Sequence, residues 1–376
     1  MFKGWNFMST RTKTARSPFK LWVVKIHRWL GVGAAIFWLI EALTGIFLGF
    51  HFEMTDAALS TAHRPTDPSA IEERIETIAT ATPDSKVHWI WTTAGLPDRY
   101  VILFSETEGT TRKAYIDGGG DILRNRPADE PPILGLLLNI HINLLSGRVG
   151  HWILIITGAL LFTNLITGLI ASWPRKGQWH ASLVPSSNGT GPAKLFSWHR
   201  AVGLWAVIPA LLTAGTGTLI LLEGPIRNML NAPEITFPVN PATGPEIGYA
   251  AASNAAVNAI PGSRFVGTTL PTLEDATYYA WVRAPGELYR GGYGGSLVVV
   301  DANDATIRGA YPATDAKAAY AFIGSFYPLH TGEFAGLFGR VLVTIIGVWL
   351  AVTIVLGILL WWKRRPARKL AEKSRS

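Results

Sequence analysis

The chain has 376 residues, of which 48% are hydrophobic and only 16% are Asp, Glu, Lys or Arg. Soluble domains carry about 25% charged residues, so this composition favours a membrane protein. Cysteine is absent, which excludes disulfides, thiolate metal sites and the C-x-x-C-H attachment of c-type haem. The net charge of +8 is unevenly distributed along the chain, and its distribution carries topological information.

Four apolar stretches are each long enough to cross a bilayer core, which takes about 20 residues. They are Trp29–Phe50, Trp152–Trp173, Ala201–Leu222 and Val341–Trp362. Glu41 is the one charged residue within them. Buried helices of a large soluble protein are the alternative, but such continuous hydropathy is typical of transmembrane helices.

The basic residues predict the orientation of these helices. They gather in the N-terminal segment, in the short loop 174–200 and in the tail, and include Lys3, Arg11, Lys13, Arg16, Lys20, Lys25, Arg175, Lys176, Lys194, Lys363, Arg364, Arg365, Arg368 and Lys369. Segment 51–132 holds 14 acids against 8 bases, and segment 223–327 holds 9 against 6. The positive-inside rule therefore places both termini in the cytoplasm and the two long segments outside. The first apolar run is too long for a cleaved signal peptide, so it is expected to remain as a span.

The two halves of the chain match in spacing. His27 and His199 each open a span and are followed seventeen residues later by Thr-Gly. His141 and His330 each precede a span and are followed by glycines and a tryptophan at equal offsets, namely Gly150, Gly168 and Trp173, and Gly339, Gly357 and Trp362. This agreement predicts an internal duplication.

The outer segments repeat as well. Ser69–Ala81 and Glu246–Ile260 have the periodicity of amphipathic helices. Each precedes strand-like runs, which are Val87–Thr93, Tyr100–Ser105 and Lys113–Ile116, then Phe265–Thr269, Thr277–Arg283 and Ser296–Val300. The predicted fold is an α-helical membrane protein with four transmembrane helices in two parallel repeats, each repeat carrying a small α+β periplasmic insertion. A pseudo-twofold axis would run along the membrane normal.

The domain boundaries follow from these elements. Residues 1–50 form the cytoplasmic N-terminus and first helix, 51–132 the first insertion, and 133–222 an outer interfacial segment with helices two and three. Residues 223–321 form the second insertion, and 322–376 an outer interfacial segment, the fourth helix and the basic tail. Short interfacial helices within Pro132–Leu145 and Tyr320–Leu337 are expected to present His141 and His330.

The four repeated histidines are candidate metal ligands. A twofold axis would bring His27 to His199 near the cytoplasmic face and His141 to His330 near the outer face, which is the bis-histidine arrangement of a b-type haem. Two imidazoles alone would leave a bare zinc or iron ion short of ligands. The alternative for each histidine is an interfacial side chain bonded to lipid or a loop. Arg28 and Arg200 either neutralise haem propionates or are positive-inside anchors.

Other polar residues leave their roles open. Glu41, whose repeat mate is Thr213, serves a proton path or a cofactor edge, or is a protonated side chain bonded to a neighbouring helix. His51 and His151 lie near the outer face without histidine mates, whereas His63, His88 and His180 are expected on the surface. Asn164 is interpreted as a helix-packing residue. An aromatic stripe comprising Trp89, Trp91, Tyr278, Tyr279 and Trp281 is either domain core or the lining of a groove for a bulky ligand.

These motifs resemble the PepSY-associated transmembrane family over nearly the whole chain. The resemblance rests on the His-x-x-x-Gly…Thr-Gly openings of spans one and three, the outer histidines and the helix-plus-strand insertions. Within that family the sequence is most similar to inner-membrane ferrisiderophore reductases of the ferrioxamine type in Gram-negative bacteria. The resemblance implies two b-type haems, with His27 and His199 on one and His141 and His330 on the other. It also implies reduction of Fe(III) in a periplasmic ferrioxamine-like siderophore.

The resulting hypothesis is an oxidoreductase of the bacterial inner membrane that carries electrons from an unknown donor to a ferric siderophore. The rival is a non-redox protein, either a siderophore permease or a membrane-anchored regulator that binds a periplasmic partner. No P-loop, nucleotide fingerprint or hydrolase nucleophile arrangement is evident, so the sequence favours neither an ATP-driven pump nor a hydrolase. Nucleic acid is not an expected partner.

Overall fold

The computed structural model describes residues 17–60, 62–93, 96, 98–107, 109–129, 133–186, 191–288 and 294–373. The basic residues Lys3, Arg11, Lys13 and Arg16, which support the predicted orientation, lie outside the described residues. The chain divides into two compact units. The first comprises Met1–Ala35, Leu160–Val207 and Thr353–Ser376, and the second Ile36–Ala159 and Ile208–Val352.

The apolar stretches all form helices. α6 (Gly147–Ser172) and α13 (Gly336–Lys373) are long and apolar enough to cross a membrane. The other two stretches are broken pairs, α1 (Pro18–Gly33) with α2 (Ala35–Leu48), and α8 (Pro192–Trp205) with α9 (Val207–Leu221). Length and composition therefore allow two spans in the described residues, or up to four if each broken pair is one span.

The two breaks fall at corresponding positions. Ala34, with φ −107°, separates α1 from α2, and Ala206, with φ −132°, separates α8 from α9. Each alanine lies seven residues after the histidine of its half, His27 or His199. Helix breaks usually occur at proline or glycine. Because alanine carries no such signal, the sequence predicted continuous helices here and missed both breaks.

Short helices follow or precede the apolar ones. They are α3 (His51–Leu59), α5 (Ile133–Asn143), α7 (Trp179–Leu183), α10 (Glu223–Met229), α12 (Ala318–Thr331), and the 3₁₀ turns η1 (Ala313–Asp315) and η2 (Glu333–Ala335). α5 carries His141 and α12 carries His330, as the sequence predicted. Pro132, the expected start of the first of these segments, lies outside the described residues.

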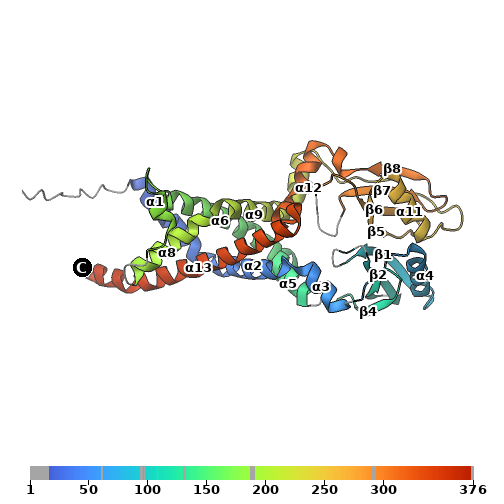
Figure 1. The fold of residues 1–376 in the computed structure, drawn as a ribbon, viewed down its shortest axis with the longest axis horizontal. Coiled ribbons are helices and arrows are strands. Elements are labelled where there is room, and N and C mark those ends of the chain that lie inside the picture. Colours follow the sequence, from blue (N-terminus) through green and yellow to red (C-terminus); the bar gives the residue numbers. More distant parts are fainter. Residues whose placement is uncertain are drawn as a thin grey trace, which may run out of the picture. The chain divides into compact units, whose positions relative to one another are not determined.

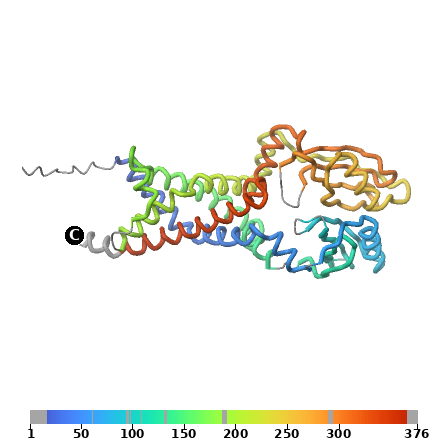
Figure 2. The backbone as a smooth tube through the Cα atoms, in the orientation of Figure 1, coloured from blue at the N-terminus to red at the C-terminus, as the bar shows by residue number. Residues whose placement is uncertain are grey.

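The strands of both insertions form one eight-stranded sheet in the order β4-β3-β2-β1-β5-β6-β7-β8 (Figures 1 and 2). The strands are β1 (Lys86–Thr92), β2 (Arg99–Thr107), β3 (Thr110–Asp117), β4 (Ile122–Pro127), β5 (Arg264–Thr269), β6 (Thr277–Arg283), β7 (Ser296–Asp301) and β8 (Ile307–Tyr311). The two halves join where β1 pairs antiparallel with β5, Ile90 opposite Thr268. The sequence pattern indicated two separate insertions and did not predict this junction or the edge strands β4 and β8.

One helix per insertion covers one face of the sheet: α4 (Pro68–Ala79) contacts β1 and β2, and α11 (Tyr249–Ala259) contacts β5, β6 and β7 (Figure 1). Asp67 caps α4 by accepting hydrogen bonds from the amides of Ser69 and Ala70. Ile71, Ile75 and Ile78 follow helical spacing and enter the core of the first half. Both helices also contact each other, so the two insertions share a continuous covered face.

Arg99 ties the sheet to α3. Its side chain is fully buried, and its Nε donates to Asp56 Oδ1 at 3.0 Å. Its Nη2 donates to the carbonyls of Ser60 and Ala62 at 3.0 and 2.6 Å. A buried guanidinium is stable only when such partners replace water. This residue therefore holds the chain that leaves α3 against the start of β2.

We predict that Arg99→Met destabilises the protein by about 3 kcal/mol, because Asp56 and two carbonyls lose their donor within a buried network. Thermal and urea unfolding of the purified protein measure this loss. Arg112→Met is the matched control, since Arg112 pairs with the 40%-exposed Glu106 at 3.2 Å and such pairs contribute less than about 1 kcal/mol. Equal losses in the two variants would contradict the role given to Arg99.

Candidate functional site

His27 and His199 meet within the first unit. The His27 Nδ1–H donates to the carbonyl of Asn164 at 3.0 Å, and the ring lies on Gly168, where a Cβ would come within 2.9 Å of His27 Cε1. The His199 Nδ1–H donates to the carbonyl of Thr353 at 3.1 Å, and its ring lies on Gly357. Both histidines come from the broken helices α1 and α8, and both glycines from the long helices α6 and α13.

His141 and His330 meet within the second unit in the same way. The His330 Nδ1–H donates to the carbonyl of Thr213 at 2.9 Å, and a Cβ on Gly217 would come within 2.6 Å of its Cε1. The His141 ring lies on Gly45, with Cε1 3.3 Å from the position of a Cβ. Its Nδ1 hydrogen-bonds the backbone of Glu41 and lies 2.9 Å from Thr44 Oγ1.

One rule describes all four contacts. Each imidazole bonds the carbonyl of the residue four positions before the glycine on which its ring lies: Asn164 before Gly168, Thr353 before Gly357, Glu41 before Gly45, and Thr213 before Gly217. In a helix that carbonyl already accepts the N–H four residues on. Because glycine has no Cβ, a side chain can approach the second lone pair of the carbonyl from the side. The repeated glycines thus receive the histidines.

Each imidazole lies near the imidazole of its partner histidine. The ring centroids lie 6.1 Å apart for His27 and His199 and 6.0 Å apart for His141 and His330. With metal–nitrogen bonds of about 2.0 Å, two imidazoles on opposite sides of one metal have centroids about 6 Å apart. Metal-ligating histidines almost always donate their other N–H to a carbonyl or carboxylate. Both pairs fit an axial bis-imidazole site.

A porphyrin fits these pairs better than a bare ion. Among the described residues there is no group of three or more His, Asp or Glu side chains that could hold a metal. A pair of imidazoles leaves the remaining coordination positions of iron to be filled by another donor. The nitrogens of a haem macrocycle supply them. His27, His199, His141 and His330 therefore remain candidate haem ligands on geometry as well as on sequence.

Glu41 distinguishes the second pair from the first. Its Oε2 lies 3.3 Å from His141 Nδ1, and its Oε1 is buried without a hydrogen-bond partner among the described residues. The repeat-equivalent Thr213 offers His330 only a backbone carbonyl. Of the roles left open for Glu41, contact with a neighbouring helix is the one that this geometry favours, since His141 belongs to α5. Asn164, interpreted as a packing residue, also supplies the carbonyl for His27, a role that its side chain could not reveal.

Arg28 and Arg200 occupy equivalent positions with different contacts. Arg200 Nη2 donates to Ser182 Oγ at 2.6 Å, which ties α8 to the short helix α7. The Arg28 guanidinium lies 5.6 Å from the centroid of the Trp29 ring. Arg200 therefore helps fix the loop between α6 and α8. A propionate contact stays a prediction for both arginines.

His51 and His151 do not join either pair. The His51 Nδ1–H donates to the Leu48 carbonyl at 2.7 Å, and the His151 Nε2–H donates to the Leu221 carbonyl at 3.1 Å. Arg340, the repeat mate of His151, donates from Nε to the Gly49 carbonyl at 3.0 Å. Gly49 and Leu221 are themselves equivalent positions, so His151 and Arg340 close the ends of corresponding helices.

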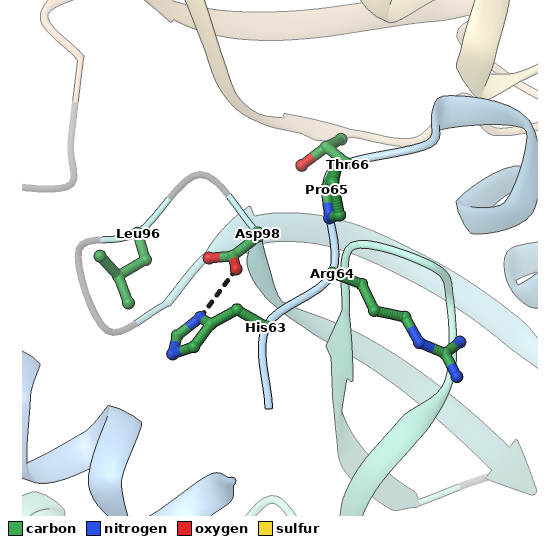
Figure 3. Close-up of a pocket in the computed structure, with 6 residues that line it drawn as sticks. All are labelled: His63, Arg64, Pro65, Thr66, Leu96 and Asp98. Carbon is green, nitrogen blue, oxygen red and sulfur yellow. Dashed lines mark hydrogen bonds and ion pairs between the residues drawn. The ribbon is translucent and has the colours of Figure 1, made fainter. Parts of the chain in front are cut away.

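A shallow, open pocket lies beside β2, and none of the four paired histidines lines it. It is lined by His63, Arg64, Pro65, Thr66, Leu96 and Asp98 (Figure 3). His63 Nδ1 lies 2.7 Å from Asp98 Oδ2, and Figure 3 shows Arg64 directed away from that pair. Arg64 instead contacts Asp121 at 2.6 Å. Because the carboxylates already have partners, this pocket offers no evident reactive group.

His88 and His180 are not part of a candidate site either. His88 Nε2 lies 2.6 Å from Ser105 Oγ on the neighbouring strand, and His180 is exposed on α7. His63 and His180 are exposed, as the sequence predicted, whereas His88 is half-buried.

Comparison with known proteins agrees with the membrane assignment. The family described as the PepSY-associated TM region matches residues 24–364. No curated protein matches the chain. The matched range contains both histidine pairs, all four glycines that contact them and the whole sheet.

We predict that the Arg340–Glu53 ion pair stabilises the protein near neutral pH and that this contribution is lost in acid. Hydrogen bonds from Arg340 lower the pKa of Glu53 below its usual value. Its stabilising contribution is thus complete above the unfolded pKa of about 4.3 and is lost as pH falls through the lower folded value. Because the Glu53 side chain is 55% exposed, the contribution is expected to stay below about 1 kcal/mol.

Unfolding midpoints of wild type and Glu53→Gln, measured between neutral and strongly acidic pH, test this. The two midpoints should differ near neutrality and converge in acid. Glu73→Gln, on the exposed side of α4, serves as the control and should track wild type throughout. A difference that grows in acid would contradict the assignment.

Proposed function

We propose that this chain, which belongs to the PepSY-associated transmembrane family, is a four-span oxidoreductase that holds two b-type haems and reduces ferric siderophores. The observation that carries the proposal is the pairing of four imidazoles, each fixed by an Nδ1 hydrogen bond and set about 6 Å from its partner ring. The matching break positions and glycine contacts in the two halves support a duplicated four-span arrangement.

The protein's own residues prepare each pair to bind iron. The carbonyls of Asn164, Thr353 and Thr213 select the tautomer that protonates Nδ1 and leaves Nε2 with a lone pair. Because each ring packs directly on a glycine, the glycines set how closely each imidazole approaches the helix backbone. Haem, when bound, supplies one-electron redox chemistry at a potential set by its axial ligands and their hydrogen bonds. Glu41 beside His141 makes the two sites chemically different.

The proposed reaction moves one electron from a cytoplasmic-side donor to a ferric siderophore on the outer side. The charge distribution of the chain supports this orientation in a bacterial inner membrane, with both termini in the cytoplasm. The donor loses one electron and Fe(III) becomes Fe(II). Hard oxygen ligands suit Fe(II) less well than Fe(III), so the chelate releases iron. One candidate haem site in each of two units supports an electron route better than a solute path.

An absorption spectrum of the purified full chain tests the cofactor. We expect a Soret band and the α and β bands of a six-coordinate b haem, with two haems per chain. His141→Ala together with His330→Ala should remove about half of the bound haem and leave the other half, since the pairs lie in separate units. A spectrum without a Soret band, or one unchanged in that variant, would exclude haem at this pair.

Reoxidation tests the activity. Protein reduced with dithionite and freed of excess reductant should be reoxidised by a ferric siderophore, with Fe(II) captured by a ferrous-specific chelator. The gallium(III) complex of the same siderophore cannot accept an electron under these conditions and is the control. If the ferric complex leaves the haem reduced, the reductase assignment fails and another acceptor must be sought.

We predict that Gly217→Ala impairs haem binding. A Cβ there would lie 2.6 Å from His330 Cε1, so the imidazole must move away from the carbonyl of Thr213 and from its partner ring. The affinity of this site for haem, measured by haem content on titration, is expected to fall at least about tenfold, the lower end of the range seen when a partner that orients a ligand is lost. Gly224→Ala, where a Cβ meets nothing within 4 Å, should keep the wild-type haem content.

A further inference from the structure

The sheet has a second face that neither α4 nor α11 covers. Along β6, Tyr278, Ala280 and Val282 enter the core beneath α11, whereas Tyr279 and Trp281 alternate to the opposite face and are half-buried. On β1, Ile90 enters the core, and Trp89 and Trp91 lie on the opposite face. The aromatic stripe expected from the sequence therefore divides: Tyr278 belongs to the core, and the other four residues belong to this open face.

Two tryptophans meet at the centre of the open face. Trp91 pairs with Gly267 on β5, and Gly267 pairs with Trp281 on β6. The two indole rings lie with centroids 4.9 Å apart at an angle of 40°. A Cβ on Gly267 would come within 2.7 Å of the Trp91 ring. Glycine at this position therefore lets the rings meet above the strand and form a broad aromatic surface.

Cationic side chains occupy the same face in the first half of the sheet. From Trp89 the register runs through Leu103 and Lys113 to Arg126. Strands lie about 4.8 Å apart, so Lys113 is about 10 Å from Trp89. Arg126 donates to Tyr115 Oη at 3.0 Å and lies over its ring, which confirms that these side chains share one face.

Among the described residues, no carboxylate neutralises these cations. In the part of the chain that the structure describes, neither Lys113 nor Arg126 has a carboxylate within 4 Å, and Arg126 Nε is buried without a partner. Burial, and then the positive charge of Arg126, lower the pKa of Lys113. Thr269 Oγ1, on the strand between Trp89 and Tyr279, is also buried without a partner among the described residues. The face thus holds unused donors beside its aromatic centre.

The second half of the sheet has no cation at the positions equivalent to Lys113 and Arg126, although Arg283 follows Trp281 on the same face. In the second half, the residues paired in turn are Gly267 on β5, Trp281 on β6, Leu297 on β7 and Tyr311 on β8. Leucine and tyrosine therefore stand where the first half has Lys113 and Arg126. Phe237, from the segment after α10, packs on Tyr311 with ring centroids 5.5 Å apart. Phe237 also packs on Tyr279, with ring centroids 5.5 Å apart, so the chain itself covers that end, whereas the tryptophans, Lys113 and Arg126 are half-buried.

We propose that the open face between Trp281 and Arg126 binds the substrate, and that it selects an anionic ferric chelate with aromatic iron ligands, such as a tris-catecholate. This rests on the proposed function and names its substrate class. Catechol rings stack on indole, and the negative charge of the complex meets Lys113 and Arg126. A cationic or neutral hydroxamate complex of the ferrioxamine type gains neither interaction. The chemistry of this face therefore differs from that implied by the resemblance to ferrioxamine reductases.

Calorimetric titration of the full chain in a non-ionic detergent tests the inference. The probes are the gallium(III) complexes of a tris-catecholate, which is trianionic, and of a neutral tris-hydroxamate, since gallium(III) binds like Fe(III) but is not reduced. We expect the trianion to bind at least about tenfold more tightly, and this preference to shrink as salt is raised. Equal affinity for both complexes, or binding of the trianion that is independent of salt, would overturn the proposal.

Variants locate the site. Lys113→Gln with Arg126→Gln should weaken trianion binding at least about tenfold and flatten its salt dependence. Arg112→Gln, on β3 beside Lys113 but one residue out of phase and so on the other face, is the matched control and should bind like wild type. If the double variant unfolds, Lys113→Gln alone should weaken binding in the same direction. Loss of affinity that is equal in the control and in the open-face variants would place the site elsewhere.

The aromatic contribution has its own control. Trp281→Leu should weaken the tris-catecholate at least about tenfold, whereas Trp179→Leu, an exposed tryptophan on α7, should leave it unchanged. The absorption spectrum of each sample separates the two hypotheses. Haem that is reoxidised equally by anionic and neutral ferric complexes would preserve the proposed function and reject the selectivity. Selective binding of the trianion by a protein without haem would reject the proposed function and preserve the selectivity of the open face.

Discussion

The contact between an imidazole and a helix backbone at glycine is the constraint on which this structure depends. A histidine within an apolar bundle must find a partner for its N–H, because an unpaired polar group there costs several kcal/mol. Helix carbonyls are abundant but are shielded by the Cβ atoms around them. Removing one Cβ exposes one carbonyl, and the imidazole that bonds it is then fixed in position, in rotamer and in tautomer. His330 on Gly217 is the tightest of the four cases.

This constraint also determines which helices must be neighbours. Each histidine comes from one apolar element and each receiving glycine from another, so every contact joins two segments that are far apart in sequence. His27 brings α1 to α6, and His199 brings α8 to α13. Because both members of a pair and both of their glycines belong to one compact unit, each candidate site is complete within its unit. The geometry of one pair therefore does not depend on the other.

The sequence predicted the histidines and their pairing because duplication shows both as equal spacing. It also contained the glycines, at equal offsets, but could not show that they touch the rings, since glycine is equally common where helices merely pack closely. The breaks at Ala34 and Ala206 carry no local signal, because alanine is a strong helix former. The edge strands were missed since their sequences are short and polar, as in Leu123–Arg126, which is how exposed edges avoid further pairing. The β1–β5 junction joins strands from different halves, and no periodicity reports such a pairing.

The positions where the halves differ make the two members of one histidine pair, and the two halves of the sheet, unequal. At some equivalent positions, different side chains make the same backbone contact. His151 and Arg340, for example, each bond the carbonyl at the end of a helix. Glu41, whose equivalent in the other half is Thr213, places a carboxylate beside one histidine pair. Lys113, whose equivalent is Leu297, places a positive charge on one half of the sheet. Duplication alone would make the two histidines of each pair equivalent and the two halves of the sheet alike. In the proposed electron route to an external acceptor, these substitutions would distinguish the His141–His330 pair from the His27–His199 pair and give one half of the sheet a charged surface for the acceptor.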